Sequence, residues 1–267
     1  MAISTCLAAV PAAHAHCNRP VQVPVSATGH SVLIKGNSII GIYPDMLRAL
    51  GAKEKCRFVF TEVPRARLEK LFETGKADMI VASTRSVRRD EFGIFIPMVR
   101  SRATLIALDD AERTPFKTTQ ELLGSKDTRL VVVRGYDYGS AYFALIEAMG
   151  KDNRLLMESD PSAVARLMKA HPGNVTIMVP TIFYTAVQED PRLVDQLDRL
   201  RVEPLDDIPW GESGVYLSKS SLEPALFQFL QTSLLRAGQS ATVHKGFLAH
   251  YPTALLKDSI KPLGKGP

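Results

Sequence analysis

Basic side chains gather in one window of this chain, and their chemistry favours an anionic ligand. Between residues 65 and 102 the chain carries nine Lys and Arg residues against five Asp and Glu, within a formal net charge of +5 over 267 residues. The guanidinium of Arg89 offers a planar fork of donors that can hold a carboxylate, and the hydroxyl of Thr84 can add another donor. Surface ion pairs between Arg89 and Asp90 or Glu91 are the alternative interpretation.

No pattern of catalytic or metal-binding residues accompanies these arginines. The sequence has no Ser-His-Asp, Cys-His or Cys-x-x-Cys arrangement, and its 6 His residues are scattered. We therefore expect no catalytic residues, no metal and no cofactor. The turn at residues 134–140 lacks the glycines of a phosphate loop, although its backbone N–H groups precede a predicted helix and could receive an anion. The basic residues are neither spread over a face nor interleaved with aromatics, so we expect no nucleic-acid partner.

The start of the chain and its cysteines indicate an oxidising compartment. Residues 1–15 contain no charged side chain and end in Ala-His-Ala, which is typical of the latter part of a secretory signal, with an ordinary flexible terminus as the alternative. Without this segment two cysteines remain, Cys17 and Cys56, each just before a strand-like run. If those strands are neighbours in a parallel sheet, the thiols can form a disulfide; two buried free thiols are the alternative. We expect a periplasmic protein.

Strands that alternate with helices predict an α/β fold. The composition, 45% hydrophobic and 23% charged, is that of a globular chain, and no apolar run is long enough to cross a bilayer. The alternation restarts after residue 110, which predicts two units with a ligand cleft between them. The predicted strands are 21–27, 57–63, 77–83, 128–135, 174–180 and 214–217. The predicted helices are 41–51, 65–73, 140–149, 161–169, 222–236 and 241–251.

Four segments in this order resemble the extracellular solute-binding proteins of amino-acid-type ABC importers. They are GIYPDML at 41–47, LFETGKADMI at 71–80, Thr84 with Arg89 in ASTRSVRRDEFGIF, and the closing SGVYLSK and TVHKGFLAHY. The resemblance implies the two-lobed type II periplasmic-binding-protein fold, with each lobe a mainly parallel sheet flanked by helices. Lobe 1 would comprise residues 18–102 plus 210–256 and lobe 2 residues 103–209, joined by hinge strands near 100–106 and 202–211. Residues 257–267 would form a flexible basic tail.

The resemblance also assigns candidate ligand-binding residues. Arg89 and Thr84, with Ser83, would hold the carboxylate of the ligand, and Ser31 lies in a loop that gives polar contacts in the family. Arg65 stands where the family often has an aromatic platform, so here the platform would be cationic or absent, and a solvated Arg65 is the alternative. The remaining two candidates come from lobe 2, namely Tyr136 and Thr181.

One departure from the family bears on the ligand. Amino-acid binders place an Asp just after the strand that corresponds to 174–180, where this chain has Pro180-Thr181. A standard amino acid is then disfavoured unless Glu158, Asp160 or Asp137 substitutes. The resemblance therefore predicts a monomeric, non-enzymatic protein that captures a small anionic or carboxylate-bearing solute for an ABC permease. The alternatives are a cyclohexadienyl-dehydratase-like enzyme and a ligand-sensing module on the same fold.

Overall fold

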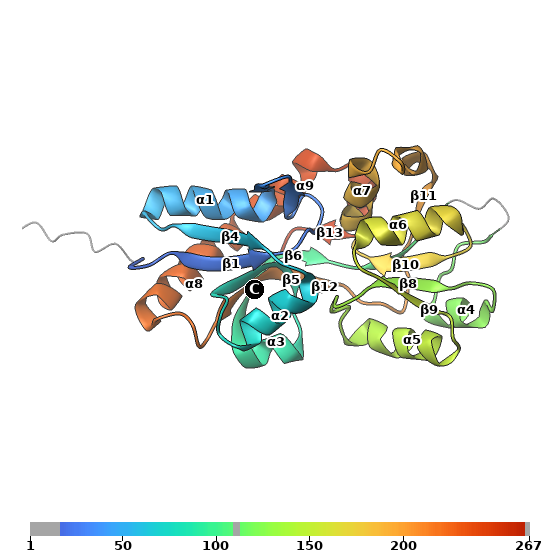
Figure 1. The fold of residues 1–267 in the computed structure, drawn as a ribbon, viewed down its shortest axis with the longest axis horizontal. Helices are drawn as coiled ribbons and strands as arrows, with labels where there is room; N and C mark the ends of the chain where they lie inside the picture. Colours follow the sequence, from blue (N-terminus) through green and yellow to red (C-terminus); the bar gives the residue numbers. More distant parts are fainter. Residues whose placement is uncertain (1–16, 109–112, 265–267) are drawn as a thin grey trace, which may run out of the picture.

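The computed structural model describes residues 17–108 and 113–264, which form two lobes side by side along the long axis of the molecule (Figure 1). The leader expected at residues 1–15 lies outside these residues. No helix within the described ranges is long and apolar enough to cross a membrane. The predicted two-lobed α/β architecture is confirmed, because each lobe has sheets flanked by helices.

Lobe 1 contains two neighbouring sheets and a short hairpin. A backbone hydrogen bond from Asp78 N to Gln22 O, 3.0 Å long, joins the two sheets. The strands are β1 (Val21–Val25) with β4 (Phe58–Glu62), then β13 (Ile260–Lys261), β6 (Gly93–Ser101), β12 (Gly211–Ser218) and β5 (Met79–Thr84), and the hairpin β2 (Leu33–Lys35) and β3 (Ser38–Ile40). The helices are α1 (Ile42–Glu54), α2 (Arg65–Glu73), α3 (Val87–Phe92), α8 (Pro224–Gln239), α9 (Thr242–His250) and α10 (Thr253–Lys257).

Lobe 2 is built on one sheet with helices on both faces. In the order across the sheet its strands are β11 (Leu200–Glu203), β7 (Thr104–Leu108), β10 (Val175–Met178), β8 (Leu130–Val133) and β9 (Leu155–Glu158). Its helices are α4 (Thr119–Gly124), α5 (Ser140–Lys151), α6 (Pro161–Ala170), α7 (Pro180–Glu189) and the 3-10 helix η1 (Val194–Arg199).

The continuous apolar runs in lobe 2 arise because both faces of its sheet are covered. Leu130 and Val132 belong to a core cluster on the α5 side, which includes Tyr142. Val131 and Val133 point the other way and pack in the cluster that contains residues of α6 and α7. All four side chains of β8 are at most 2% exposed. A strand buried on both faces has no polar alternation, as its sequence shows.

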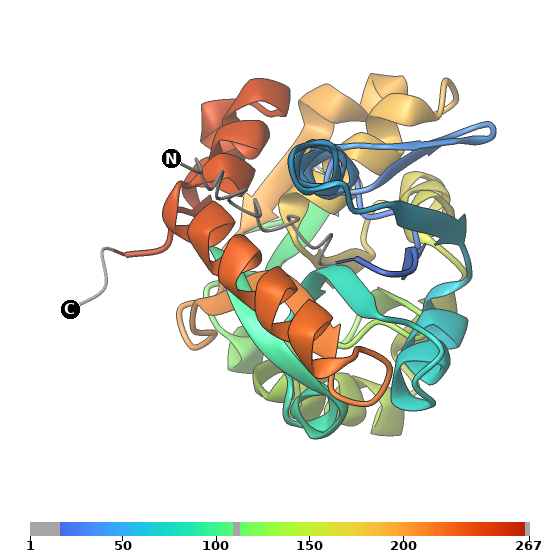
Figure 2. The same cartoon turned by 90° about the vertical axis from the view of Figure 1, so that its left-hand side faces the viewer.

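In lobe 1 the longest helix covers the sheet through one apolar stripe. Leu226, Leu230 and Leu234 recur every four residues, so they lie on the same face of α8, and each is at most 2% exposed. This face packs against β6, and the helix crosses that strand in the view of Figure 2. The spacing predicted from the sequence is therefore the spacing that forms the core.

The strand directions correct one expectation. Lobe 1 was expected to have a mainly parallel sheet, but only β1 and β4 are parallel, while β5, β12, β6 and β13 are antiparallel neighbours. In lobe 2, β8, β9 and β10 are parallel, and β7 and β11 run against their neighbours. The cause is the connection between lobes: β6 leads out of lobe 1 and β12 leads back into it. Paired outgoing and returning strands must run in opposite directions.

The chain crosses between the lobes twice. The first crossing is Arg102–Ala103, between β6 and β7, and the second is the segment between Glu203 and Gly211. A further contact joins the lobes without a crossing, because the hydroxyl of Tyr251 lies 2.8 Å from the hydroxyl of Thr185 on α7. Both crossings fall within the segments expected to contain the hinge strands, and a hinge motion there stays a prediction.

The end of the chain is more ordered than expected. Residues 257–267 were expected to form a flexible tail, but Ile260–Lys261 form β13, which pairs with Ser101 and Arg100 of β6. Ser259 and Ile260 are at most 4% exposed. Burial of Ile260 and the strand hydrogen bonds explain why this segment is held in place; residues 265–267 lie outside the description.

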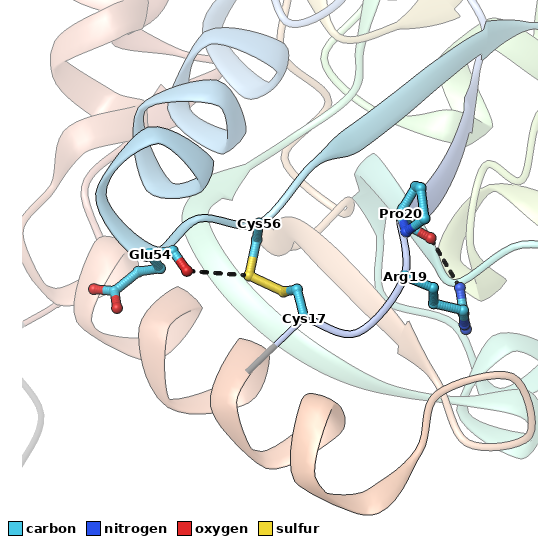
Figure 3. Close-up of a disulfide and its surroundings, with 5 residues drawn as sticks. All are labelled: Cys17, Arg19, Pro20, Glu54 and Cys56. Carbon is cyan, nitrogen blue, oxygen red and sulfur yellow. Dashed lines mark hydrogen bonds between the residues drawn. A yellow bond between two sulfur atoms is a disulfide. The ribbon is translucent and has the colours of Figure 1, made fainter. Parts of the chain in front are cut away.

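A disulfide joins Cys17 to Cys56, with 5.2 Å between their Cα atoms (Figure 3). The two cysteines precede β1 and β4, which pair in parallel from Val21 and Phe58 onward, so the thiols meet at one edge of the sheet. The structure thus decides between the two interpretations left open by the sequence, in favour of the bridge.

Candidate functional site

A cavity of about 280 Å³ lies between the lobes, and residues of both lobes and of both crossings form its wall. A wider groove of about 1330 Å³ shares the segments 136–140 and 210–212 with this cavity and continues between α3 and α5. The cavity lies where the sequence predicted the ligand cleft. Of the seven residues predicted to bind the ligand, five line the cavity: Ser31, Arg65, Thr84, Tyr136 and Thr181.

Arg89 and Ser83 lie behind the cavity wall. Arg89 is 2% exposed, and its Nε and Nη2 donate to the two carboxylate oxygens of Glu69 at 2.9 and 2.8 Å. Its Nη1 donates to the carbonyl of Thr84 at 2.8 Å. The donor fork that was expected to hold a ligand carboxylate therefore already holds a carboxylate of the protein. A bidentate contact between Arg89 and a ligand would require the displacement of Glu69.

Arg65, the second arginine beside Glu69, lines the cavity. Pro64, whose ring fixes φ, precedes α2 and makes Arg65 its first residue. Glu69 follows one helical turn later, and its carboxylate lies 3.1 Å from Arg65 Nε. The guanidinium of Arg65 also lies 6.0 Å from the ring centre of Tyr136 in lobe 2.

The guanidinium of Arg65 is buried but incompletely bonded. Its side chain is 10% exposed, and Nη2 donates to Ser83 Oγ at a long 3.4 Å. The geometry at Nε does not satisfy a hydrogen bond to Glu69 despite the short distance, and Nη1 donates to no residue in the described ranges. Arg65 thus retains donor capacity at the cavity wall, which Arg89 does not.

Burial and the neighbouring acids act on the pKa of Arg65 in opposite directions. Burial, followed by repulsion from Arg89, lowers the pKa of Arg65, and the attraction of Glu69 and Asp137 does not compensate. Burial alone would raise the pKa of Glu69, but hydrogen bonds from Arg89 and the charge of Arg65 hold that pKa below its usual value. Glu69 therefore accepts its hydrogen bonds from Arg89. Its contact with Arg65 balances the positive charge of Arg65 only in part.

The loop between β1 and β2 brings small polar groups to the cavity. Thr28 and Ser31 are at most 6% exposed, and the hydroxyl of Thr28 has no hydrogen-bond partner among the described residues. Gly29 between them has φ 67°, and a Cβ there would lie 2.7 Å from the hydroxyl of Tyr251 and 2.9 Å from the carbonyl of Thr181. Only glycine allows the loop of lobe 1 to approach lobe 2 this closely.

Lobe 2 contributes a turn before α5. Asp137 Oδ1 accepts a hydrogen bond from Gly139 N at 3.0 Å, which holds the turn, and Tyr136 donates to the carbonyl of Ala27 across the cleft at 3.5 Å. The helix begins at Ser140, next to the cavity. Its first backbone N–H groups add partial positive charge to the wall.

Of the three acids considered as substitutes for the missing Asp, the cavity wall contains one, Asp137. Glu158 ends β9, and Asp160 accepts a hydrogen bond from Ala163 N as the cap of α6. Asp137 itself lies 3.6 Å from Arg89 Nη1. Burial opposes ionisation, but Arg89 and the bond from Gly139 outweigh it and lower the pKa of Asp137. Its negative charge therefore has partners within the protein.

Two important residues escaped the sequence analysis. Glu69 was visible only as one acid in the charged window, although its four-residue spacing from Arg65 was a usable signal. Trp210, the sole tryptophan of the sequence, lines the cavity at the second crossing. Three cations approach its ring, with Lys261 Nζ at 4.2 Å and the guanidinium carbons of Arg102 and Arg100 at 5.0 and 5.8 Å. No local motif marked this position.

The described part of the chain offers no ready metal site. No group of three or more His, Cys, Asp or Glu side chains in residues 17–108 and 113–264 lies close enough together to hold an ion. The cavity wall supplies hydrogen bonding and charge through arginine, hydroxyl and backbone N–H groups.

Comparison with known proteins gives matches in structure alone. No protein-family model matches the chain, and no curated protein sequence matches it. The arginine-, lysine-, histidine-binding protein ArtJ from Geobacillus stearothermophilus has a similar structure, with a TM-score of 0.66, 15% identity, and coverage of 88% of this chain and 97% of that chain. A histidine kinase sensor domain with similarity to periplasmic binding proteins matches with a TM-score of 0.66 at 17% identity, covering 86% of this chain and 95% of the other.

An ancestral amino acid-binding protein, described as a precursor of cyclohexadienyl dehydratase, also matches. Its TM-score is 0.63 at 15% identity, with 87% of this chain and 96% of that chain covered. Amino-acid-binding proteins recur among the similar structures. At such identities the likeness concerns the fold. This chain has the two-lobed fold of the type II periplasmic binding proteins.

Proposed function

We propose that this protein binds a small carboxylate-bearing solute between its two lobes. The observation that carries the proposal is the guanidinium of Arg65, which lines the cavity, is 10% exposed and is only partly balanced by Glu69. A carboxylate beside Arg65 would gain charge-assisted hydrogen bonds in a buried setting, where such bonds are strong. The unpartnered hydroxyl of Thr28 and the first N–H groups of α5 are among the further donors at the cavity.

The proposal moves the ligand carboxylate from Arg89 to Arg65. Arg89 remains essential to the site because it holds Glu69, and through Glu69 it positions Arg65. Thr84, Ser31, Tyr136 and Thr181 keep their proposed role as wall residues that contact the solute.

We propose that the protein acts in the periplasm and delivers its solute to an ABC permease. The Cys17–Cys56 disulfide supports an oxidising compartment. The transport role rests on the shared fold with binding proteins of such importers. Deletion of the gene should abolish uptake of the identified solute; unchanged uptake would instead favour a receptor or sensor as the partner.

Catalysis is the second candidate, and one observation favours it: the cavity wall contains an acid, Asp137. A general acid or base works best with a pKa near the operating pH. Since the pKa of Asp137 is lowered, mainly by Arg89 acting against the effect of burial, this carboxylate stays ionised and serves poorly as a proton donor. We propose binding without chemistry, and turnover of prephenate or arogenate by the purified protein would contradict it.

The proposal is tested by a thermal-shift screen of carboxylates, amino acids and polyamines, followed by calorimetry on the hits. Arg65→Met removes the charge and the donors but keeps the unbranched stem of the side chain, and should weaken carboxylate binding roughly tenfold to hundredfold. Arg67→Met is the matched control, because Arg67 lies on the same helix with its side chain exposed. Binding of polyamines without carboxylates, or equal affinity of the two variants, would refute the proposal.

A further inference from the structure

The wall of the cavity changes character toward the crossings between the lobes. Six large side chains line that end, and we call them the hinge-side wall: Tyr142, Met178, Val179, Ile182, Ile208 and Trp210. Tyr142, Met178 and Ile208 are at most 5% exposed. The wall combines residues from α5, the end of β10, the start of α7 and the second crossing. Apart from the Tyr142 hydroxyl and the Trp210 N–H, it is hydrocarbon or aromatic ring.

Neighbouring contacts place this wall beside the crossings. Met178 is the register partner of Thr104, the first residue after the first crossing. The hydroxyl of Tyr142 donates to the carbonyl of Ala103. The guanidinium of Arg102 stacks on Trp210 at 5.0 Å, and its Nε donates to the carbonyl of Asp258 at 3.4 Å. The Tyr142 hydroxyl and Arg102 Nε are thus engaged within the protein, and apart from the Trp210 N–H the six side chains of the hinge-side wall offer a ligand apolar contact.

Arg65 brings free donor capacity to another part of the same cavity. Arg65 contacts Ser83, Glu69 and Tyr136, and none of these belongs to the hinge-side wall. The negative charge of Asp137 is satisfied by Arg89 and Gly139 N, and Glu212 is a second acid on the cavity wall. A solute bound here therefore meets a cation at one place and hydrocarbon at another.

We propose that the solute is a monocarboxylate with an apolar body. The carboxylate lies against Arg65 and the body lies against the hinge-side wall; this proposal rests on the proposed function. An aliphatic or arylalkyl carboxylate fits both surfaces. A second carboxylate or a hydroxyl-rich chain would lose hydration against these apolar side chains, and Arg102, which is held by Trp210 and the carbonyl of Asp258, is a cation beside them.

The first test is a calorimetric series of acetate, butyrate and hexanoate against the whole protein, with adipate and 6-aminohexanoate as polar counterparts of hexanoate. Each added methylene should tighten binding roughly fourfold. Adipate carries a second carboxylate in place of the terminal methyl group of hexanoate. Because that carboxylate would lose its hydration at the hinge-side wall, hexanoate should bind at least tenfold tighter than adipate. Carboxylate binding that depends on Arg65 but does not strengthen with chain length, or adipate binding as tightly as hexanoate, overturns this inference and leaves the proposed function standing.

The second test changes the wall. Ile182→Val and Ile182→Thr have nearly the same shape and differ by one methyl or hydroxyl group, so Ile182→Val is the matched control. Hexanoate should bind roughly tenfold more weakly to Ile182→Thr than to Ile182→Val, and acetate equally to both. Equal hexanoate affinities overturn the inference. If no carboxylate of the series binds the wild-type protein, the proposed function fails and this inference with it. The chain-length series needs no variant, so the result stands even if Ile182→Thr fails to fold.

Discussion

The sharpest prediction concerns Arg89→Met, because the sequence and the structure give this residue different roles. As a ligand clamp, Arg89 would be dispensable for folding and essential for binding. In the structure its side chain is 3% exposed and makes two hydrogen bonds to Glu69 and one to the carbonyl of Thr84. Met fills a similar volume without the charge. The variant therefore removes the partner of a buried carboxylate.

The expected cost follows from that burial. Removal of one partner from a buried ion pair costs about 3–5 kcal/mol, because the other charge stays without compensation. Glu69 keeps 15% exposure and the nearby Arg65, so we expect the lower end, about 3 kcal/mol. For a chain of this size the melting temperature should fall by roughly 6 to 12 °C. The double variant Arg89→Met, Glu69→Met also removes the carboxylate that has lost its partner, and should regain part of that loss.

The measurement is urea unfolding followed by circular dichroism, with Arg88→Met as the control. Arg88 is the adjacent residue, but its side chain is 69% exposed and pairs with Glu73 at the surface, so its removal should cost less than about 1 kcal/mol. If Arg89→Met is as stable as Arg88→Met, or if the double variant is no more stable than Arg89→Met, the structural role assigned to Arg89 is wrong.

Three further predictions concern the bridge, the contact between lobes and the cavity. The disulfide between Cys17 and Cys56 spans a sequence separation of 39, which corresponds to about 4 kcal/mol in the chain-entropy model, so a reductant should lower the urea midpoint of the wild type but not of the C17S/C56S variant. Tyr251→Phe removes the hydroxyl 2.8 Å from Thr185 and should lower the free energy of unfolding by about 1 kcal/mol. It should also increase the radius of gyration in X-ray scattering, and an unchanged radius would contradict a role of this hydroxyl in holding the lobes together. Emission of Trp210 should change on ligand binding with the calorimetric affinity, and a silent titration would place the ligand away from the hinge-side wall.

Local patterns predicted the elements of this fold well. The apolar runs at 128–135 and 174–180 became β8 and β10, and the four-residue spacing in 222–236 became the buried face of α8. These features depend on neighbours in sequence. The antiparallel core of lobe 1 could not be predicted in this way, since β5 and β12 are more than 100 residues apart and their direction follows from the route of the chain between the lobes.

The candidate site was predictable in place but not in detail. The family resemblance pointed to the segments that surround the cavity, and Arg65 and Thr84 were among the residues named. The partner of Arg89 was not predictable, because Glu69 lies on a different helix and its approach depends on how α2 and α3 pack. The packing of α2 against α3 decides whether Arg65 or Arg89 reaches the cavity, because the two side chains have the same chemistry.

The pairing of β13 with β6 has a practical consequence for experiments on this protein. Lys261 is paired opposite Arg100, one residue before the end of the strand that leads into lobe 2. In a body that opens and closes about a pivot, displacement is smallest near the pivot. A linker to a surface or a fluorescent dye attached next to β13 would therefore not restrict the movement of either lobe. One attached at the far end of a lobe would move with that lobe. For the predicted hinge motion, attachment next to β13 is thus the orientation of choice in single-molecule measurements.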